Sequence, residues 1–106
     1  MPDERVEMLK QILADNPNDA FARYGLAMEY AKAGDIDNAL AEFQRILAAN
    51  PDYTPAYQMA AQTLMRAARN DEARQMIEAG IASARRTRNQ HAQSEMQGML
   101  DELAGI

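Results

Sequence analysis

Cysteine and tryptophan are absent from this 106-residue chain, and histidine occurs only once. The absence of cysteine excludes a disulfide scaffold, a thiolate metal site and a cysteine nucleophile. A single histidine cannot form a histidine-rich metal cluster, so we expect neither a bound metal nor another cofactor. Glycine and proline are also scarce, with 5 and 4 residues, so few positions interrupt regular structure.

Positive charge is in the minority, since 11 Lys and Arg oppose 16 Asp and Glu for a net charge of −5. Neutralisation of phosphates supplies most non-specific affinity for nucleic acid, so we expect no nucleic-acid partner. No apolar run approaches the ~20 residues that span a bilayer. The segment Met1–Arg5 lacks the order of an export signal, in which positive charge precedes an apolar run. The interpretation is a cytoplasmic protein without membrane association.

The abundant residues favour helices. Hydrophobic residues make up 47% of the chain and charged residues 25%, which is the balance of a globular domain and not of a disordered segment. Alanine, leucine, methionine, glutamate, glutamine and arginine dominate, and all are good helix formers. Valine occurs once, as Val6, so strands have little material. We therefore predict a single all-α domain.

Apolar residues recur at spacings of three and four, which predicts about six helices separated by short turns. Gly34 can adopt the left-handed conformation that ends a helix. The first four helices are expected at 3–14, from after Asn18 to Gly34, at 35–49 and at 54–68, while the fifth begins near Asp71 and the last at Thr87.

Three helix starts carry local signals. Asn18 is a good N-cap residue for the second helix. Thr54 is expected to cap the fourth helix, with Pro55 at its first helical position. Thr87 and Gln90 have the spacing of a capping box, which predicts the start of the last helix.

The chain repeats itself at an interval of 34 residues, because Asn16-Pro17 and Asn50-Pro51 stand that far apart. On the same offset, small or apolar character is kept at the expected packing positions. The matched pairs are Ala27 with Ala61, Ala39 with Ala73 and Phe43 with Ile77.

This pattern resembles the tetratricopeptide repeat, a helix-turn-helix unit of the same length. When a repeat starts at Ala20, seven residues fall on signature positions of the family: Leu26, Ala27, Tyr30, Gly34, Ala39, Phe43 and Pro51. The family's usual early tryptophan is Arg23 here. Arg85 replaces the closing proline of the second repeat, so the fifth helix is expected to run further before it turns.

The resemblance implies a short right-handed α-solenoid of antiparallel helix pairs. We predict one domain over 1–106, with a leading half-repeat helix at 1–16, repeats at 20–53 and 54–87, and a capping helix at 88–106. Neighbouring repeats must stack, because one repeat cannot bury its own apolar face. In strict register His91 and Glu95 would face inward. A slip of one residue instead brings Ala92, Met96 and Met99 to the interface, so we interpret the last helix as a cap.

The resemblance also implies a binding scaffold, in which the first helix of each pair lines a concave groove. The family's groove positions correspond to six residues of this chain: Tyr24, Met28, Ala31, Gln58, Gln62 and Met65. Tyrosine offers a rigid face, methionine an adaptable apolar contact, and glutamine both a donor and an acceptor for a peptide backbone. The alternative is that these residues only pack beneath the capping helix. The lysine, asparagine and arginine with which some members clamp a terminal carboxylate are missing, so we expect no such clamp.

Two functions follow as hypotheses. In the first, the protein is a protein-protein interaction module that holds a peptide or helical segment of a partner in the concave groove. In the second, it is a self-associating unit, for example a homodimer, that stacks through the edges of the solenoid. An exposed apolar patch on the first or last helix would favour the second hypothesis, because such patches usually mark contacts.

Other side chains permit more than one interpretation. Arg85, Arg86 and Arg88 form a basic run that could hold an acidic partner or a phosphate. Cations at the end of a helix also offset the helix dipole, which explains them without a ligand. Met8 and Met76 are predicted to fill gaps on buried faces.

Catalysis is not expected. A nucleophile needs a base within hydrogen-bond reach and a group that orients the base. Ser83 and Ser94 are the two serines, and neither has an evident partner. His91 lies one helical turn before Glu95, which predicts a surface pair and no catalytic group. No glycine-rich loop could cradle a phosphate.

Overall fold

Six α-helices account for most of residues 2–105, the part of the chain that this computed structural model describes, and no strand occurs in that part. Met1 and Ile106, the ends of the predicted domain, lie outside the described residues. The helices are α1 (Pro2–Asp15), α2 (Ala20–Lys32), α3 (Ile36–Ala49), α4 (Thr54–Arg66), α5 (Asn70–Arg86) and α6 (Gln90–Leu103).

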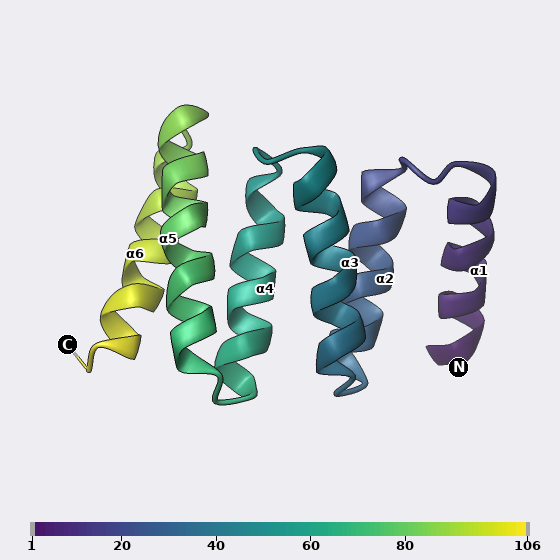
Figure 1. Ribbon diagram of the computed structural model, residues 1–106, viewed down its shortest axis with the longest axis horizontal. Coiled ribbons are helices and arrows are strands. Elements are labelled where there is room, and N and C mark those ends of the chain that lie inside the picture. Colours follow the sequence, from purple (N-terminus) through teal and green to yellow (C-terminus); the bar gives the residue numbers. More distant parts are fainter. Residues whose placement is uncertain (1, 106) are drawn as a thin grey trace.

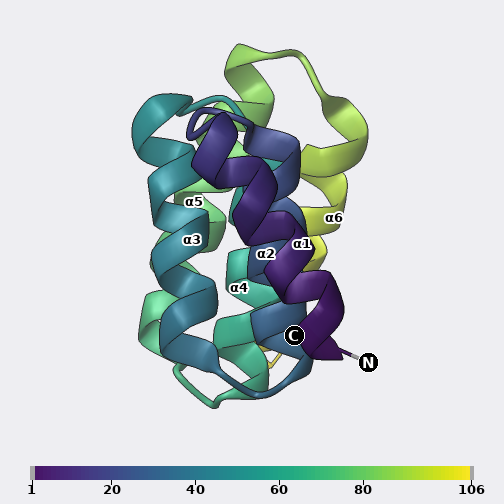
Figure 2. The same cartoon turned by 90° about the vertical axis from the view of Figure 1, so that its right-hand side faces the viewer.

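Each helix packs against the next one in the chain, and the short turns make consecutive helices antiparallel (Figure 1). Contacts also join α2 to α4 and α4 to α6, so these three helices form one layer. The view in Figure 2 places α3 and α5 together on the other side. The result is a slab with extents of 42 × 28 × 19 Å, the elongated form of an all-α solenoid.

Two predicted helix starts are wrong by one or more residues. The N-cap of α2 is Asp19 and not Asn18, because the Asp19 carboxylate accepts the backbone N–H of Ala22 at 3.0 Å. The N-cap of α6 is Asn89, whose side-chain oxygen accepts the backbone N–H of Ala92 at 3.0 Å. Thr87 forms no capping box. Its hydroxyl instead donates to carbonyls of the preceding helix.

Thr54 is likewise not a cap, since it is the first residue of α4 and Tyr53 occupies the cap position without a side-chain bond. The Thr54 side chain is buried, and its hydroxyl lies 2.9 Å from the hydroxyl of Ser83 on α5. Thr54 therefore makes a tertiary contact in place of the predicted cap, because a buried hydroxyl needs a hydrogen-bond partner within the protein.

The turns after α2 and α4 each contain a residue with a positive φ. Gly34 has a φ of 79°, as the sequence predicts, and Ala68 adopts a φ of 59° at the corresponding position 34 residues later. The left-handed conformation costs little for glycine but crowds the Cβ of alanine against the backbone. Ala68 therefore retains the turn of the repeat at a cost in stability.

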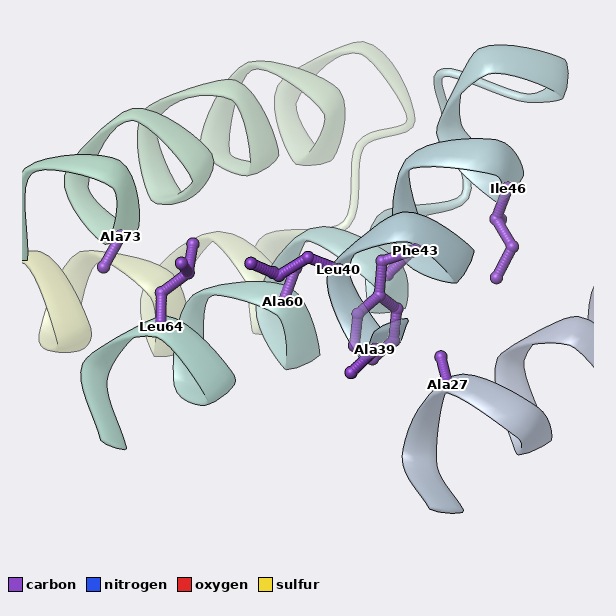
Figure 3. Close-up of a cluster of buried hydrophobic side chains, with 9 residues drawn as sticks. Ala27, Ala39, Leu40, Phe43, Ile46, Ala60, Leu64 and Ala73 are labelled. Carbon is purple, nitrogen blue, oxygen red and sulfur yellow. The ribbon is translucent and has the colours of Figure 1, made fainter. Parts of the chain in front are cut away.

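The main core lies where α2, α3 and α4 meet and consists of small residues facing large ones. Leu40 of α3 lies beside Ala60 of α4 in Figure 3. Phe43 is fully buried in the same cluster. Small side chains let the helix axes approach, and the large ones fill the remaining space at the density of a protein interior. The buried members are Ala27, Ala39, Leu40, Phe43, Ile46, Ala56, Ala60, Leu64 and Ala73.

A second cluster joins α6 to α4 and α5. The predicted one-residue slip is confirmed, because Ala92 and Met96 are buried while His91 and Glu95 are exposed. Helix α5 continues to Arg86, as expected without the closing proline. A Cβ added to Gly80 would lie 2.5 Å from the Met96 sulfur and 2.7 Å from the Tyr57 Cβ, so only glycine admits this approach.

The first helix packs through Leu9 and Leu13 against α2. The prediction that Met8 is buried is wrong: its exposed fraction is 51%, because α1 has no described helix on its outer side. Ile12 is also more exposed than expected from its position on the apolar face, at 39%. Met76 is partly buried against the core, in agreement with the prediction.

The substitution Ala68→Gly tests the shared turn. It should raise the free energy of unfolding by roughly 0.5–1 kcal/mol, because glycine adopts the positive φ without the crowding of a Cβ. The measurement is chemical denaturation followed by circular dichroism. The control is Ala67→Gly, since Ala67 has an ordinary φ of −85°. The control should lose stability, and a gain of equal size in both variants would contradict the assignment of strain to Ala68.

Candidate functional site

The three predicted groove residues of α2 lie half-buried against the main core. Tyr24, Met28 and Ala31 all pack against that cluster. The Tyr24 ring meets Phe43 edge-on at a centroid distance of 6.0 Å and lies 5.9 Å from the Tyr53 ring. Burial, and next the neighbouring Tyr53, raise the pKa of the Tyr24 phenol. The Tyr24 side chain therefore packs against the core and also exposes part of its surface to solvent.

The three predicted residues of α4 are also half-buried, and two of them share a cleft. Gln62 and Met65 line a cleft of about 320 Å³ between α4 and α6. Arg66 continues the wall on α4, and Met99 and Glu102 contribute the wall on α6. Gln58 lies one turn earlier on α4 and is not among the residues lining this cleft.

The position of α6 bears on the two interpretations of these residues. The α6 backbone approaches α4 and α5 and, within residues 2–105, does not approach α2. Packing beneath the capping helix can therefore account for Met65, which contacts both core clusters, better than for Tyr24 or Met28. Helix α6 extends the layer formed by α2 and α4.

Three lining residues of the cleft were missed by the sequence reading. Met99 belongs to the apolar stripe of the last helix, so the stripe was visible but not its neighbour on α4. Arg66 and Glu102 carry no local signal that distinguishes them from other surface charges. Only the packing of α6 on α4 brings these two side chains to one cleft.

The cleft can accommodate a small apolar group among polar neighbours. The thioethers of Met65 and Met99 are flexible and polarisable, so they adapt to side chains of different shape. Gln62 offers both a donor and an acceptor, Arg66 offers donors and Glu102 offers acceptors. An apolar centre with a few polar groups around it is typical of a binding site.

Among the described residues, no group of three or more His, Asp and Glu side chains could hold a metal ion. Every buried polar side-chain atom of residues described has a hydrogen-bond partner, so none is left directed at a missing ligand. The His91 ring lies 2.8 Å from the Glu95 carboxylate on the surface of α6, which confirms the predicted pair. No helix within residues 2–105 has the length and apolarity required to cross a bilayer.

The arginines in the second half of the chain differ in whether they form ion pairs. Arg86 lies 2.7 Å from Asp52, which joins the end of α5 to the turn before α4. Hydrogen bonding to Asp52 raises the pKa of Arg86. Arg85 and Arg88 make no ion pair in the described chain, so the predicted basic run has mixed roles.

Arg69 connects two helices at the opposite edge. Its guanidinium lies 2.7 Å from Glu72 and 3.2 Å from Asp37, the latter at the start of α3. The bond from Arg69 lowers the pKa of the Glu72 carboxyl, and the same bond raises the pKa of Arg69. Asp37 and Glu72 are exposed and Arg69 is half-buried, so their pairing is screened by water and orients the turn more than it stabilises the fold.

Comparison with known sequences identifies relatives over nearly the whole chain. A family profile described as tetratricopeptide repeat matches residues 30–94, and a second profile of the same description matches residues 2–54. A TPR repeat-containing protein of Pseudomonas aeruginosa is 31% identical over 98 residues, which cover 92% of this chain and 93% of that protein.

Solved structures agree with this assignment. A tetratricopeptide repeat domain protein from Salinibacter ruber aligns with a TM-score of 0.78 at 33% identity, over 86% of this chain and 92% of that one. The TPR2B domain of yeast Sti1, solved as a complex with pHsp70, aligns with a TM-score of 0.86 over 94% of this chain and 80% of that one. Its identity is 17%, so this likeness concerns the fold alone.

Substitution of Tyr24 tests whether its ring is part of the core. Tyr24→Ala should lower the free energy of unfolding by about 1–3 kcal/mol, because it removes the ring contacts with Phe43 and Tyr53. Tyr24→Phe keeps the ring and should stay near the parent value. Urea denaturation measures both variants. If Tyr24→Ala is as stable as the parent protein, the ring does not belong to the core.

Proposed function

Because this chain belongs to the tetratricopeptide repeat family, we propose that it is a protein-protein interaction module that binds a peptide or helical segment of a partner along the layer of α2, α4 and α6. The binding residues in this proposal are the predicted ones, Tyr24, Met28, Ala31, Gln58, Gln62 and Met65. The family acts in general as a scaffold without catalysis, and the proposal assigns this chain no reaction.

The cleft between α4 and α6 is the observation that carries the proposal. It combines Met65 and Met99 with three polar side chains, in a space of about 320 Å³. That volume is at the lower end of the range of ligand pockets, and its two methionine side chains suit an apolar side chain of a partner. The rest of the partner would lie across α4 toward Met28 and Tyr24 of α2.

A protein of similar fold has been solved with a protein partner. The similar TPR2B domain of yeast Sti1 was solved as a complex with pHsp70. The clamp of lysine, asparagine and arginine is missing at the groove positions of this chain, where Tyr24 and Met28 stand instead. The proposed partner segment is therefore recognised through apolar and amide contacts, and a free carboxyl terminus is not required.

Selection from a random peptide display library tests the groove. Peptides selected on the parent protein should bind the double variant Gln62→Ala, Met65→Ala about tenfold more weakly, because the variant loses an apolar contact and an amide bond. Fluorescence anisotropy measures the affinities. Met8→Ala is the matched control, because Met8 is exposed on α1 and lies away from the cleft.

Two results would contradict the groove. The first is selected peptides that bind the parent, the double variant and the control alike. The second is a selection that yields no peptide above background. The helicity of the double variant should stay near the parent value, and a large loss would make Gln62 and Met65 core residues.

Self-association is the second candidate, and exposed apolar side chains favour it. Phe21 in the first turn of α2 is 82% exposed, the largest value among the large hydrophobic residues that stand out on the surface. Met8 and Ile12, one turn apart on the same side of α1, are also exposed. Met8 and Ile12 lie on the first helix and Phe21 lies in the first turn of the second, so a second copy could stack against this half of the solenoid.

Light scattering after gel filtration distinguishes the two candidates. A mass near 11.8 kDa that does not change with concentration would exclude self-association and favour the groove over it. If the parent protein is a dimer, the double variant Phe21→Ser, Ile12→Ser should have the monomer mass, because it removes the exposed apolar area. That result would support stacking through this end. A dimer that persists in the variant would exclude this end as the contact.

A further inference from the structure

A larger cleft lies outside the groove, at the edge formed by the turns. Its volume is about 700 Å³, and it opens between the α1–α2 turn, the start of α2 and the end of α3. Charged residues of one sign only line it, in a protein whose net charge is −5. The lining residues are Pro17, Asn18, Ala20, Arg23, Arg45, Ile46, Ala49 and Asn50.

Two guanidiniums at this cleft share one carboxylate. Arg23 lies 2.6 Å from one oxygen of Glu42, and Arg45 lies 2.9 Å from the other. The Glu42 side chain is only 10% exposed, and both of its oxygens are already bonded. Within this cluster of Arg23, Arg45 and Glu42, two positive charges face one negative charge.

Arg45 is the arginine of this cluster that a ligand can reach. Its side chain is 63% exposed, whereas the Arg23 side chain is 17% exposed and also donates to the carbonyl of Pro17. The ion pair with Glu42 engages one nitrogen of Arg45, so further N–H donors remain. A guanidinium fixed on one side is well placed to bind a second carboxylate on the other, because less side-chain entropy is lost.

The edge continues into a neighbouring cleft of about 660 Å³ between the α3–α4 and α5–α6 turns. Asn50 lines both clefts. The second cleft adds Arg88 and Asn89, and Arg88 makes no ion pair in the described chain. Asp52 also lines it, but its carboxylate is engaged by Arg86. Exposed donors thus follow one another along the turns.

We propose that this turn edge is a second protein-binding surface, which takes an extended acidic segment of a partner across Arg45, Asn50 and Arg88. Carboxylates of the segment pair with the two guanidiniums. The amide N–H groups of Asn50 meet backbone carbonyls, which are free in an extended segment but bonded internally in a helix. This surface is distinct from the groove, since Gln62 and Met65 line neither cleft.

Fluorescence anisotropy with a labelled peptide of alternating glutamate and alanine tests this surface. Alternation places the carboxylates on one side of an extended chain. The peptide should bind, and the same peptide with glutamine should bind at least about tenfold more weakly, because charge-assisted bonds are replaced by neutral ones. Added salt should weaken the glutamate peptide only.

Variants of equal charge locate the site. Arg45→Gln and Arg88→Gln should each weaken the glutamate peptide by roughly three- to tenfold, the loss of one charge-assisted contact. Arg74→Gln removes the same charge from an exposed arginine on α5 that lines neither cleft, and should change the affinity by less than about twofold. Circular dichroism checks that each variant keeps the parent helicity.

Four outcomes would overturn the proposal. Equal weakening by all three arginine variants would show attraction to net charge without a site. Equal binding of the glutamine peptide would remove the role of carboxylates. Absence of binding at millimolar peptide would remove the site. NMR shifts of the side-chain amides should occur at Asn18 and Asn50, and shifts at Gln62 instead would place the peptide in the groove, which rejects the turn edge while supporting the proposed function.

Discussion

Close approach of helices at alanine is the constraint on which the structure depends. Ala27, Ala39, Ala60 and Ala73 are fully buried, and each stands where a larger side chain would separate two helices. The space that they leave is filled by Phe43 and by a few large aliphatic residues. Because the apolar contacts lie between neighbouring helices, the stability of every helix depends on its neighbour, and the chain needs a cover at each end.

The two ends are covered in different ways. Helix α1 packs on α2 through Leu9 and Leu13 and is tied to it by an ion pair, 2.8 Å long, between Arg5 and the buried Glu29. Helix α6 packs on two helices at once, with Met96 fully buried. The first end therefore exposes apolar side chains to a possible partner, whereas the second end forms one side of a cleft. The two proposed interfaces, for self-association and for peptide binding, therefore lie in different parts of the molecule.

Arginine at the family's tryptophan position links the fold to the turn edge. Tryptophan would fill the space near the start of α2 with an apolar ring. Arg23 instead holds Glu42 on α3 and the Pro17 carbonyl in the preceding turn. The helix pair is thus joined by charge at this point, and a buried carboxylate with two cations leaves positive potential at the surface. The groove and the turn edge offer different chemistry, apolar and amide contacts in one and excess donors in the other.

The spacing of residues along the chain is enough to predict the class of fold, the number of helices, the repeat interval and the slip of the last helix. These features depend on periodic apolar residues, on prolines and on Gly34, which act over a few neighbouring positions. The packing of the helices was needed to show that Thr54 bonds Ser83 and does not cap α4, that Met8 is exposed, and that Met99 and Glu102 face Gln62 across a cleft. Such relations join residues far apart in the chain, and they depend on which helix face meets which neighbour. Local periodicity marks a face as apolar, but the packing of the neighbouring helix decides how much of that face is covered.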